Sequence, residues 1–343
     1  MEPPVEARFY EKIGRNRVRC ALCAHRCLIE EGRRGLCAVR ENRGGILFSL
    51  VYGRVVSRDR DPIEKKPLFH FLPGSCAYSV ATVGCNFTCG NCQNHYISQY
   101  PREHGGRILG DDVTPAELVA GAVESGCESI AYTYTEPTVY LEYALDAAHL
   151  AKEEGRANVL VTNGYMTEEA TEEIVRVIDA ANVDLKGMSE AFYRELCGAN
   201  LRPVLDSIHR LHKAGVWVEV TTLVIPGKND GPDALRWTAE ALVGISPSIP
   251  WHVTRFHPAY KLSNLPPTPV ATLEAAQRMG REAGLEYVYV GNVPGEGEDT
   301  RCPACGALLI KRIGFLVREN RLSDGACPSC GREAAGVFSN PAA

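Results

Sequence analysis

Apolar runs of β type alternate with helical patterns along most of the chain, from about residue 76 to about residue 298. The expected strands cover residues 78–83, 129–135, 158–162, 183–186, 216–224, 251–256 and 287–290. The expected helices cover residues 115–125, 139–154, 168–180, 191–214, 234–243 and 273–283. Strands that alternate with helices are typical of a parallel sheet, so six or seven such units predict an open or partial barrel, or a doubly wound sheet.

Both of these architectures place their active site at the carboxyl ends of the strands. A doubly wound dinucleotide-binding sheet would have a G-x-G-x-x-G turn after its first strand, and this chain has Gly84-Cys85-Asn86-Phe87 there instead. The capping box Thr114-Pro115-Ala116-Glu117 supports the first helix. We therefore expect an α/β fold, a partial barrel whose chemistry lies at the carboxyl edge of the sheet.

The composition of the chain argues against nucleic-acid binding, membrane insertion and secretion. The chain has 343 residues, 37 Lys and Arg against 42 Asp and Glu, and a formal charge of −5, which argues against nucleic acid or an anionic membrane as its main partner. Hydrophobic residues make up 45% of the chain, enough for a full core, yet no apolar run is long enough to cross a membrane. The first six residues lack the plan of a signal peptide, so we expect a cytoplasmic protein.

Fourteen cysteines are many for a cytoplasmic protein, where reducing conditions disfavour structural disulfides, and clustered cysteines then indicate metal sites. Three groups stand out: the N-terminal four (Cys20, Cys23, Cys27 and Cys37), the triplet (Cys85, Cys89 and Cys92) and the C-terminal four (Cys302, Cys305, Cys327 and Cys330). Cys127 and Cys197 stand alone and are expected to be small buried side chains. Cys76 is also alone, nine residues before the triplet.

The triplet has the spacing C-x3-C-x2-C and directly follows the first expected strand. A closed zinc site and an ordinary iron–sulfur cluster both take four protein ligands, so three thiolates indicate a [4Fe–4S] cluster with one iron open to a substrate or cofactor. The alternative is a zinc site completed by a distant residue such as His95 or Cys76.

The two outer groups each offer four thiolates. The C-terminal four form two C-P-x-C-G knuckles, which predict structural zinc in a ribbon, although an iron site of the rubredoxin type would use the same ligands. The N-terminal four suit zinc or an auxiliary iron–sulfur cluster equally well, and His25 among them could replace one thiolate.

The triplet, its place after the first strand, Cys92-Gln93-Asn94 and the preceding Asp61-Pro62-Ile63-Glu64-Lys65-Lys66-Pro67-Leu68 resemble the radical S-adenosylmethionine (SAM) superfamily. Within it they resemble the radical enzyme of the AmmeMemoRadiSam system, a relative of the pyruvate formate-lyase activating enzymes. The resemblance covers nearly the whole chain and implies a partial (β/α)6-type barrel. One departure is Asn91, where superfamily members commonly have an aromatic residue before the third cysteine.

The resemblance also implies a SAM site at the strand ends. Glu136-Pro137 stands where the family has a Gly-Gly-Glu-Pro turn that holds the ammonium group of the methionine moiety, with Tyr134 and Thr135 in place of the glycines. The residues that it implies for the cofactor are Thr135, Glu136, Asn163, Asp184, Lys186, Gly291 and Asn292. Taken singly, each of these polar residues could merely cap a strand or begin a helix or loop. His252 and His257, near the sixth strand, could face substrate or belong to the core.

We expect three parts: an N-terminal four-cysteine module with a β-hairpin (1–70), a radical SAM core (71–298) and a C-terminal four-cysteine ribbon of the zinc type (299–343), with the Gly/Glu-rich segment 294–298 as linker. The expected activity is reductive cleavage of SAM to a 5′-deoxyadenosyl radical that abstracts hydrogen from an unknown substrate, with a donor such as flavodoxin or ferredoxin and with AmmeMemoRadiSam partner proteins. The alternatives are activation of a glycyl radical enzyme, and a non-catalytic zinc-ribbon scaffold.

Overall fold

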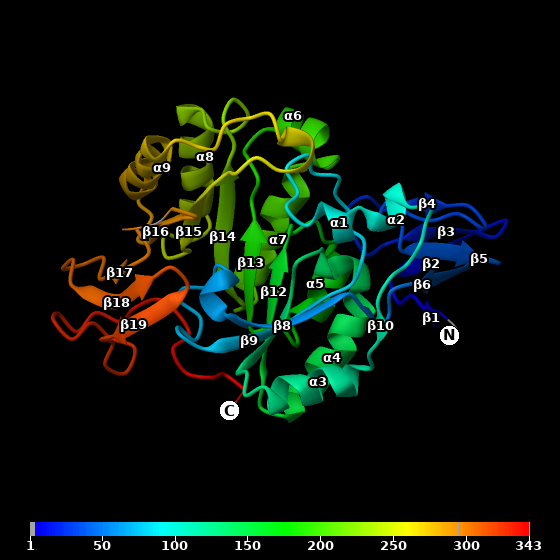
Figure 1. The fold of residues 1–343 in the computed structure, drawn as a ribbon, viewed down its shortest axis with the longest axis horizontal. Helices are drawn as coiled ribbons and strands as arrows, with labels where there is room; N and C mark the ends of the chain where they lie inside the picture. Colours follow the sequence, from blue (N-terminus) through cyan, green and yellow to red (C-terminus); the bar gives the residue numbers. More distant parts are fainter. Residues whose placement is uncertain (1–3, 294, 296, 343) are drawn as a thin grey trace.

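The computed structural model describes residues 4–293, 295 and 297–342. The first three residues and two members of the expected linker, Pro294 and Glu296, lie outside the described residues. An eight-stranded sheet dominates the structure, in the order β16-β15-β14-β13-β12-β11-β9-β8 (Figure 1). Its strands are β8 (Ser57–Pro62), β9 (Cys76–Ala81), β11 (Ser129–Tyr132), β12 (Ala157–Thr162), β13 (Ala180–Asp184), β14 (Trp217–Val224), β15 (Trp251–Arg255) and β16 (Val288–Gly291).

Seven of these strands run parallel and pair in chain order, and β8 alone is antiparallel, at the edge beside β9. The expected α/β class with a parallel sheet is confirmed. The sheet stays open, because β8 and β16 form its two edges and do not pair with each other. All seven carboxyl ends therefore meet along one edge of the sheet, where a site can form.

A helix follows each of the first six parallel strands. The main connecting helices are α3 (Pro115–Glu124), α4 (Leu141–Glu153), α5 (Glu168–Ile174), α7 (Arg202–Lys213), α8 (Pro232–Val243) and α9 (Val270–Ala283). The expected capping box begins α3: Thr114 Oγ1 accepts from the Glu117 amide at 3.2 Å, and the Glu117 carboxylate accepts from the Thr114 amide at 2.8 Å. Two short helices, α1 (His95–Ser98) and α2 (Tyr100–Glu103), follow the triplet.

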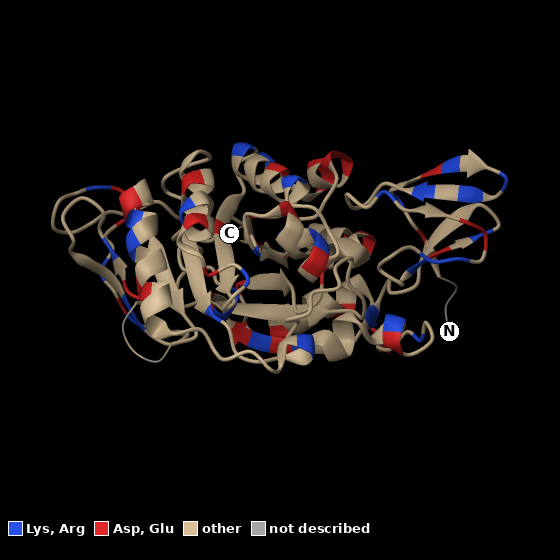
Figure 2. Cartoon of the chain, turned by 90° about the horizontal axis from the view of Figure 1, so that it is seen from above, with Lys and Arg blue, Asp and Glu red and all other residues tan. Residues whose placement is uncertain are grey.

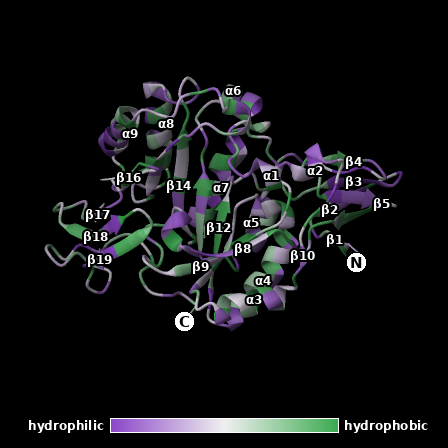
Figure 3. Cartoon of the chain, viewed as in Figure 1, coloured by the Kyte–Doolittle hydropathy of each residue, from purple (hydrophilic) through white to green (hydrophobic). Residues whose placement is uncertain are grey.

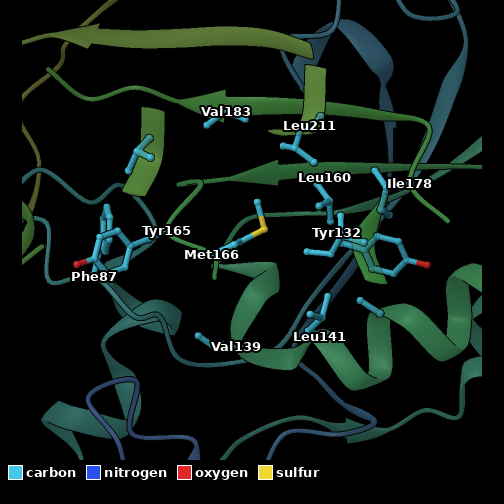
Figure 4. Packing of buried hydrophobic residues seen from close by; sticks show 14 of the residues in the cluster. Phe87, Tyr132, Val139, Leu141, Leu160, Tyr165, Met166, Ile178, Val183 and Leu211 are labelled. Atoms are coloured by element: carbon cyan, nitrogen blue, oxygen red, sulfur yellow. The ribbon is translucent and has the colours of Figure 1, made fainter. Parts of the chain in front are cut away.

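The core lies between the sheet and these helices. Figure 4 shows Leu160 and Val183 on neighbouring strands, with Met166 and Leu141 beside them. All four side chains are at most 1% exposed. Hydrophobic colouring concentrates on the strands, while the hydrophilic residues lie mainly on outer helix turns and loops (Figure 3). Burial of this apolar surface is what orders the strand ends.

The N-terminal module consists of two small sheets at one end of the molecule (Figure 1). One sheet has the order β1-β6-β5 and the other β2-β3-β4. Their bounds are β1 (Val5–Glu6), β2 (Tyr10–Gly14), β3 (Arg17–Cys20), β4 (Leu28–Ile29), β5 (Arg40–Arg43) and β6 (Ile46–Ser49), and β7 (Arg54–Val55) pairs separately with β10 (Asp111–Asp112). Arg40 of β5 makes a buried ion pair with Glu142 of α4, which fixes the module to the barrel.

The C-terminal ribbon lies at the opposite end and consists of β17 (Thr300–Arg301), β18 (Leu308–Ile313) and β19 (Leu316–Asn320) (Figure 1). Arg312 of β18 fixes it to the barrel: its guanidinium donates to the Phe69 carbonyl at 2.6 Å and lies 4.4 Å from the centre of the Phe69 ring. Val337 adds a parallel bridge to Phe71.

Residues 57–71 form the edge strand β8 and a buried segment after it. The segment 67–71 is not a strand, because the amides of Phe69 and His70 donate to the buried carboxylate of Glu219 at 3.0 and 2.7 Å instead of to a strand. The charged segment before it is not a solvated hairpin: β8 pairs with β9, and Asp61 and Lys66 are 4% and 2% exposed.

The expected helix over 191–214 is interrupted. It is divided into α6 (Glu190–Phe192), a π-helical turn η3 (Tyr193–Cys197) and α7, with Gly198 at φ +69° ending the π turn. Figure 2 shows Lys and Arg interspersed with Asp and Glu along the ribbon. Within the described residues, no helix is long and apolar enough to cross a membrane.

Candidate active site

A cavity of about 730 Å³ lies at the carboxyl edge of the parallel sheet. It is lined by all three cysteines of the triplet and by residues at the carboxyl ends of five further strands, β11, β12, β13, β14 and β16. The expected site residues that line it are Cys85, Cys89, Cys92, Thr135, Glu136, Asn163, Asp184, Lys186 and Asn292. Of the expected set, Gly291 does not line the cavity; it ends β16 one residue before Asn292. The structure thus brings nearly the whole expected set to one place.

The triplet lies on a loop that folds against the π-helical turn η3. The amides of Thr88 and Gly90 donate to the carbonyls of Cys197 and Leu196, at 2.9 and 3.1 Å. Gly198 allows this close approach, since a Cβ there would lie 2.6 Å from Thr88 Oγ1. The loop is therefore fixed by backbone contacts to a segment more than 100 residues away, which no local sequence pattern indicates.

Glu136 is 2% exposed and lies at the end of the loop after β11. Its Oε1 accepts from the amide and hydroxyl of Thr138 and from the Thr162 hydroxyl, at 3.0, 2.5 and 2.7 Å, and its Oε2 accepts from the Asn163 amide at 2.8 Å. Burial raises the pKa of Glu136 although these four donors favour the carboxylate. Glu136 is thus a cap of the following 3-10 turn and, at the same time, a carboxylate on the cavity wall.

Asn163 connects Glu136 to the triplet loop. Its side-chain amide donates to Asn86 Oδ1 at 2.7 Å, and its Oδ1 accepts from the Tyr165 amide at 3.0 Å. Thr135, by contrast, directs its hydroxyl to the Thr82 carbonyl at 2.9 Å. Asn163 therefore links two strand ends to the loop that carries the thiols.

Asp184 and Lys186 form an ion pair of 2.9 Å after β13. Burial disfavours the charge on Lys186, but Asp184 and the nearby thiols of Cys89 and Cys197 outweigh that effect and raise its pKa well above the usual value. Lys186 is therefore a permanent cation beside the second thiol of the triplet. The partner that a buried lysine requires is present.

Tyr134, in place of a family glycine, keeps a glycine-like backbone conformation with φ +62°. Its hydroxyl donates to Asp61, its carbonyl accepts from Asn94 at 2.8 Å, and the Lys66 ammonium lies 4.5 Å from the centre of its ring. Asp61 also accepts from Lys66 and Ser79, at 2.6 and 2.8 Å. These contacts hold Tyr134 in the left-handed backbone region, which costs about 1–3 kcal/mol of conformational free energy for a residue other than glycine.

Sequence reasoning missed this role of the segment Asp61–Lys66. Burial works against ionisation of Asp61, yet hydrogen bonds from Lys65, Lys66 and Tyr134 hold its pKa well below the usual range. Lys65 and Lys66 both line the cavity. The signal that could have revealed it was a block of charges directly before the first parallel strand, since a buried ionised group requires partners.

The residues weighed as a fourth ligand of the triplet lie elsewhere. Cys76 begins β9 at the opposite end of that strand, with its sulfur 2.6 Å from that of Cys127. The His95 ring stacks on Tyr260 at 4.5 Å and does not line the cavity. His252 is a core residue bonded to Glu219 at 2.7 Å, as the core interpretation predicted, and His257 is exposed.

The C-terminal four come together in the geometry of a single-ion site. The sulfurs of Cys302 and Cys330 are 3.6 Å apart, those of Cys305 and Cys327 are 3.7 Å apart, and all four lie within 4.8 Å of one another. A tetrahedral ion with metal–sulfur bonds of about 2.3 Å places its sulfurs about 3.8 Å apart. The group suits one tetrahedral metal ion, and both zinc and iron fit this donor set.

Comparison with known proteins agrees with this geometry. Residues 79–237 match the model of the radical SAM superfamily. The chain therefore contains a radical SAM superfamily domain. An uncharacterized protein of Methanocaldococcus jannaschii is 47% identical over 332 residues, which cover 96% of this chain and 98% of that protein.

A solved structure of low identity shows a similar fold, and a second one matches over a shorter part of the chain. Streptococcus suis SuiB bound to S-adenosylmethionine matches with a TM-score of 0.51 and 12% identity, over 67% of this chain and 53% of that one. A domain of pyruvate-formate lyase-activating enzyme from Bacteroides vulgatus matches over 48% of this chain and 99% of that one, with 17% identity and a TM-score of 0.42.

The match of residues 79–237 to the radical SAM model implies a [4Fe–4S] cluster and SAM, and it supports an enzyme. The cavity fits such ligands: its volume lies within the range of about 300–1,000 Å³ that is typical of small-molecule sites. Three thiols, a buried carboxylate and a lysine converge on it. In addition, the buried Oδ1 of Asn91 on its wall has no hydrogen-bond partner among the described residues.

Proposed function

We propose that the triplet binds a [4Fe–4S] cluster with one open iron and that the cavity binds SAM at that iron. The observation that supports this most is the set of three thiols, without a fourth cysteine among the described residues of the wall, beside polar strand ends in one cavity. A cluster bound by three thiolates would leave one iron open to SAM. When bound and reduced, the cluster supplies the electron that cleaves the carbon–sulfur bond of SAM.

Three residues of the chain would bind SAM, position the triplet loop and offset the charge of the cluster. Glu136 would accept the ammonium group of SAM, because its Oε2 has one protein donor where Oε1 has three. Asn163 would position the triplet loop through Asn86. Lys186 would offset the negative charge of a thiolate-bound cluster, since it stays cationic beside Cys89.

The binding of SAM at the cluster is tested by EPR on anaerobically reconstituted, dithionite-reduced protein. Addition of SAM is expected to change the spectrum of the reduced cluster, because a ligand of one iron changes. Glu136→Gln should require a higher SAM concentration for the same change. A spectrum that saturating SAM leaves unaltered would contradict the proposed site.

We further propose that the chain is the radical enzyme of an AmmeMemoRadiSam-type system and acts with partner proteins on a substrate of its own. Its support is the resemblance of the segment Asp61–Leu68, whose two lysines at 65 and 66 line the cavity beside Tyr134. Phe315 from the ribbon also lines it, so the C-terminal part contributes to the substrate side. The alternative is activation of a glycyl radical enzyme.

A spin-trap-free EPR experiment separates these two activities. The reduced enzyme is incubated with SAM and with each co-purifying protein in turn. A glycyl radical doublet on a partner would establish an activating enzyme. Its absence, together with SAM cleavage that depends on a small molecule in the partner's preparation, would support the AmmeMemoRadiSam-type assignment.

A further inference from the structure

The N-terminal four lie around one cavity of their own, at the junction of the N-terminal module and the barrel. Cys20 ends β3, and its amide donates to the Cys27 carbonyl at 2.9 Å, which closes the first loop. Cys23 lies in the isolated bridge to Met166 of the barrel, and Cys37 lies shortly before β5. Four thiols from one short stretch of chain therefore face one space, and Cys20 and Cys37 are at most 9% exposed.

No three sulfurs of the N-terminal four all lie within 4.8 Å of one another, as the ligands of a single ion would. Among the residues that the structure describes, only the C-terminal four form a set of three or more ligand atoms that all lie within 4.8 Å of one another. The N-terminal four and the triplet both fall outside that limit. In a [4Fe–4S] cluster each thiolate binds a different iron, so the sulfurs stand farther apart than around one tetrahedral ion.

The chain therefore contains two classes of cysteine site. The C-terminal four have the spacing of a single ion, with 3.6 and 3.7 Å between paired sulfurs. The triplet, for which the radical SAM match implies a [4Fe–4S] cluster, has the wide spacing. The N-terminal four belong with the triplet by this criterion.

A buried cation on the wall of the same cavity is a second, independent indication. Arg40 is 1% exposed and lines the cavity. Its Nη2 pairs with Glu142, whereas its Nε and Nη1 have no hydrogen-bond partner in the described part of the chain. Charged donors buried without an acceptor cost free energy, and an anionic metal–thiolate group offers both the charge and the sulfur acceptors that they lack. Arg40 therefore indicates a bound metal–thiolate group, and the spacing of the sulfurs favours a cluster over a single ion.

We propose that Cys20, Cys23, Cys27 and Cys37 bind a second [4Fe–4S] cluster, closed by four thiolates, with Arg40 as its buried counter-ion. His25 is not one of its ligands through Nε2, because that nitrogen donates to the Asn86 carbonyl at 2.9 Å. The proposal does not depend on the SAM chemistry, since it concerns ligands outside the triplet. It assigns zinc, or a single iron, to the C-terminal four alone.

The test removes the triplet and leaves the proposed ligands intact. The full-length variant C85A/C89A/C92A is reconstituted anaerobically with iron and sulfide and analysed for iron, sulfide and zinc. We expect about four irons and four sulfides per chain in this variant, against about eight in the wild type, and the EPR signal of a reduced [4Fe–4S] cluster. Two zinc ions with no sulfide, or the absence of any cluster signal, would overturn the proposal.

A complementary variant keeps the triplet. Cys20→Ser with Cys27→Ser should reduce the iron of the otherwise wild-type chain by about half. Cys127→Ser is the matched control, a buried cysteine outside all three groups, and should keep the full iron content. Equal iron in the double variant and the control would overturn the assignment, and because the first experiment leaves the N-terminal module unaltered, misfolding of the double variant does not decide the outcome.

Discussion

Replacement of Glu136 by glutamine tests the proposed contact with the ammonium group of SAM. The side chain keeps its shape, so Oε1 can keep the three donors from Thr138 and Thr162. The new amide nitrogen then meets the Asn163 amide, which is itself a donor at 2.8 Å from the present oxygen. The variant therefore loses one internal hydrogen bond and the negative charge.

The loss of the negative charge of Glu136 determines how much affinity for SAM the variant loses. A hydrogen bond to a charged group contributes about 1.5–3 kcal/mol, which corresponds to a loss of about 10- to 150-fold in affinity for SAM. Because burial raises the pKa of Glu136, the wild-type affinity should also fall as the pH is lowered toward that pKa, where the carboxylate is protonated. The variant should lack this pH dependence.

The assay is equilibrium binding to reconstituted protein of SAM and of an analogue without the α-amino group. The preference for SAM over the analogue should be about 10- to 150-fold smaller in the variant than in the wild type. Iron content and the EPR signal serve as controls for an intact cluster. The reasoning is refuted if the variant keeps the wild-type preference for SAM.

Three further predictions concern the loop, the ribbon and the junction. Cys89→Ser should lose the cluster of the triplet, whereas Cys197→Ser should keep it, because Cys197 is buried behind the loop and does not line the cavity. Iron content measures both outcomes, and equal losses of iron in the two variants would contradict the assigned ligands. Burial lowers the pKa of His70 from 6.5 to about 4, so the unfolded chain binds the extra proton, and stability should fall by up to about 3 kcal/mol as the pH drops from about 6.5 to about 4. Thermal unfolding of the wild type and of His70→Gln checks this, and an unchanged pH dependence in the variant would contradict it. Gly84→Ala should destabilise by about 1–3 kcal/mol, because φ is +97° and the new methyl would lie 2.5 Å from a side-chain carbon of the N-terminal module; a Tm equal to that of the wild type would contradict this.

The parallel sheet could be predicted because strand and helix periodicities differ and alternate over seven strands. The edge strand β8 could not be predicted. Its sequence Ser57–Pro62 carries alternating charges that disfavour a strand, and only its antiparallel pairing with β9 and the partners of Asp61 order it. Likewise, the amides of residues 69 and 70 are bound by the distant Glu219.

The polar wall of the cavity could be predicted because the carboxyl ends of parallel strands converge. The contact between Tyr134 and Asp61 could not be predicted, because the two residues are 73 positions apart in the sequence. It also depends on the antiparallel strand β8, which the sequence pattern does not indicate. The spacing of the sulfurs could not be predicted from the sequence either, because two groups of four cysteines offer the same donors whether the loops hold the sulfurs close together or far apart.

Formation of 5′-deoxyadenosine tests the central claim most directly. Anaerobically reconstituted wild-type protein is incubated with SAM and dithionite, and the product is quantified by liquid chromatography and mass spectrometry. The account predicts 5′-deoxyadenosine and methionine from the wild type and neither from C85A/C89A/C92A, although the variant keeps its ribbon metal. Product from that variant at the wild-type rate, or none from wild-type protein with a full cluster, would contradict the account.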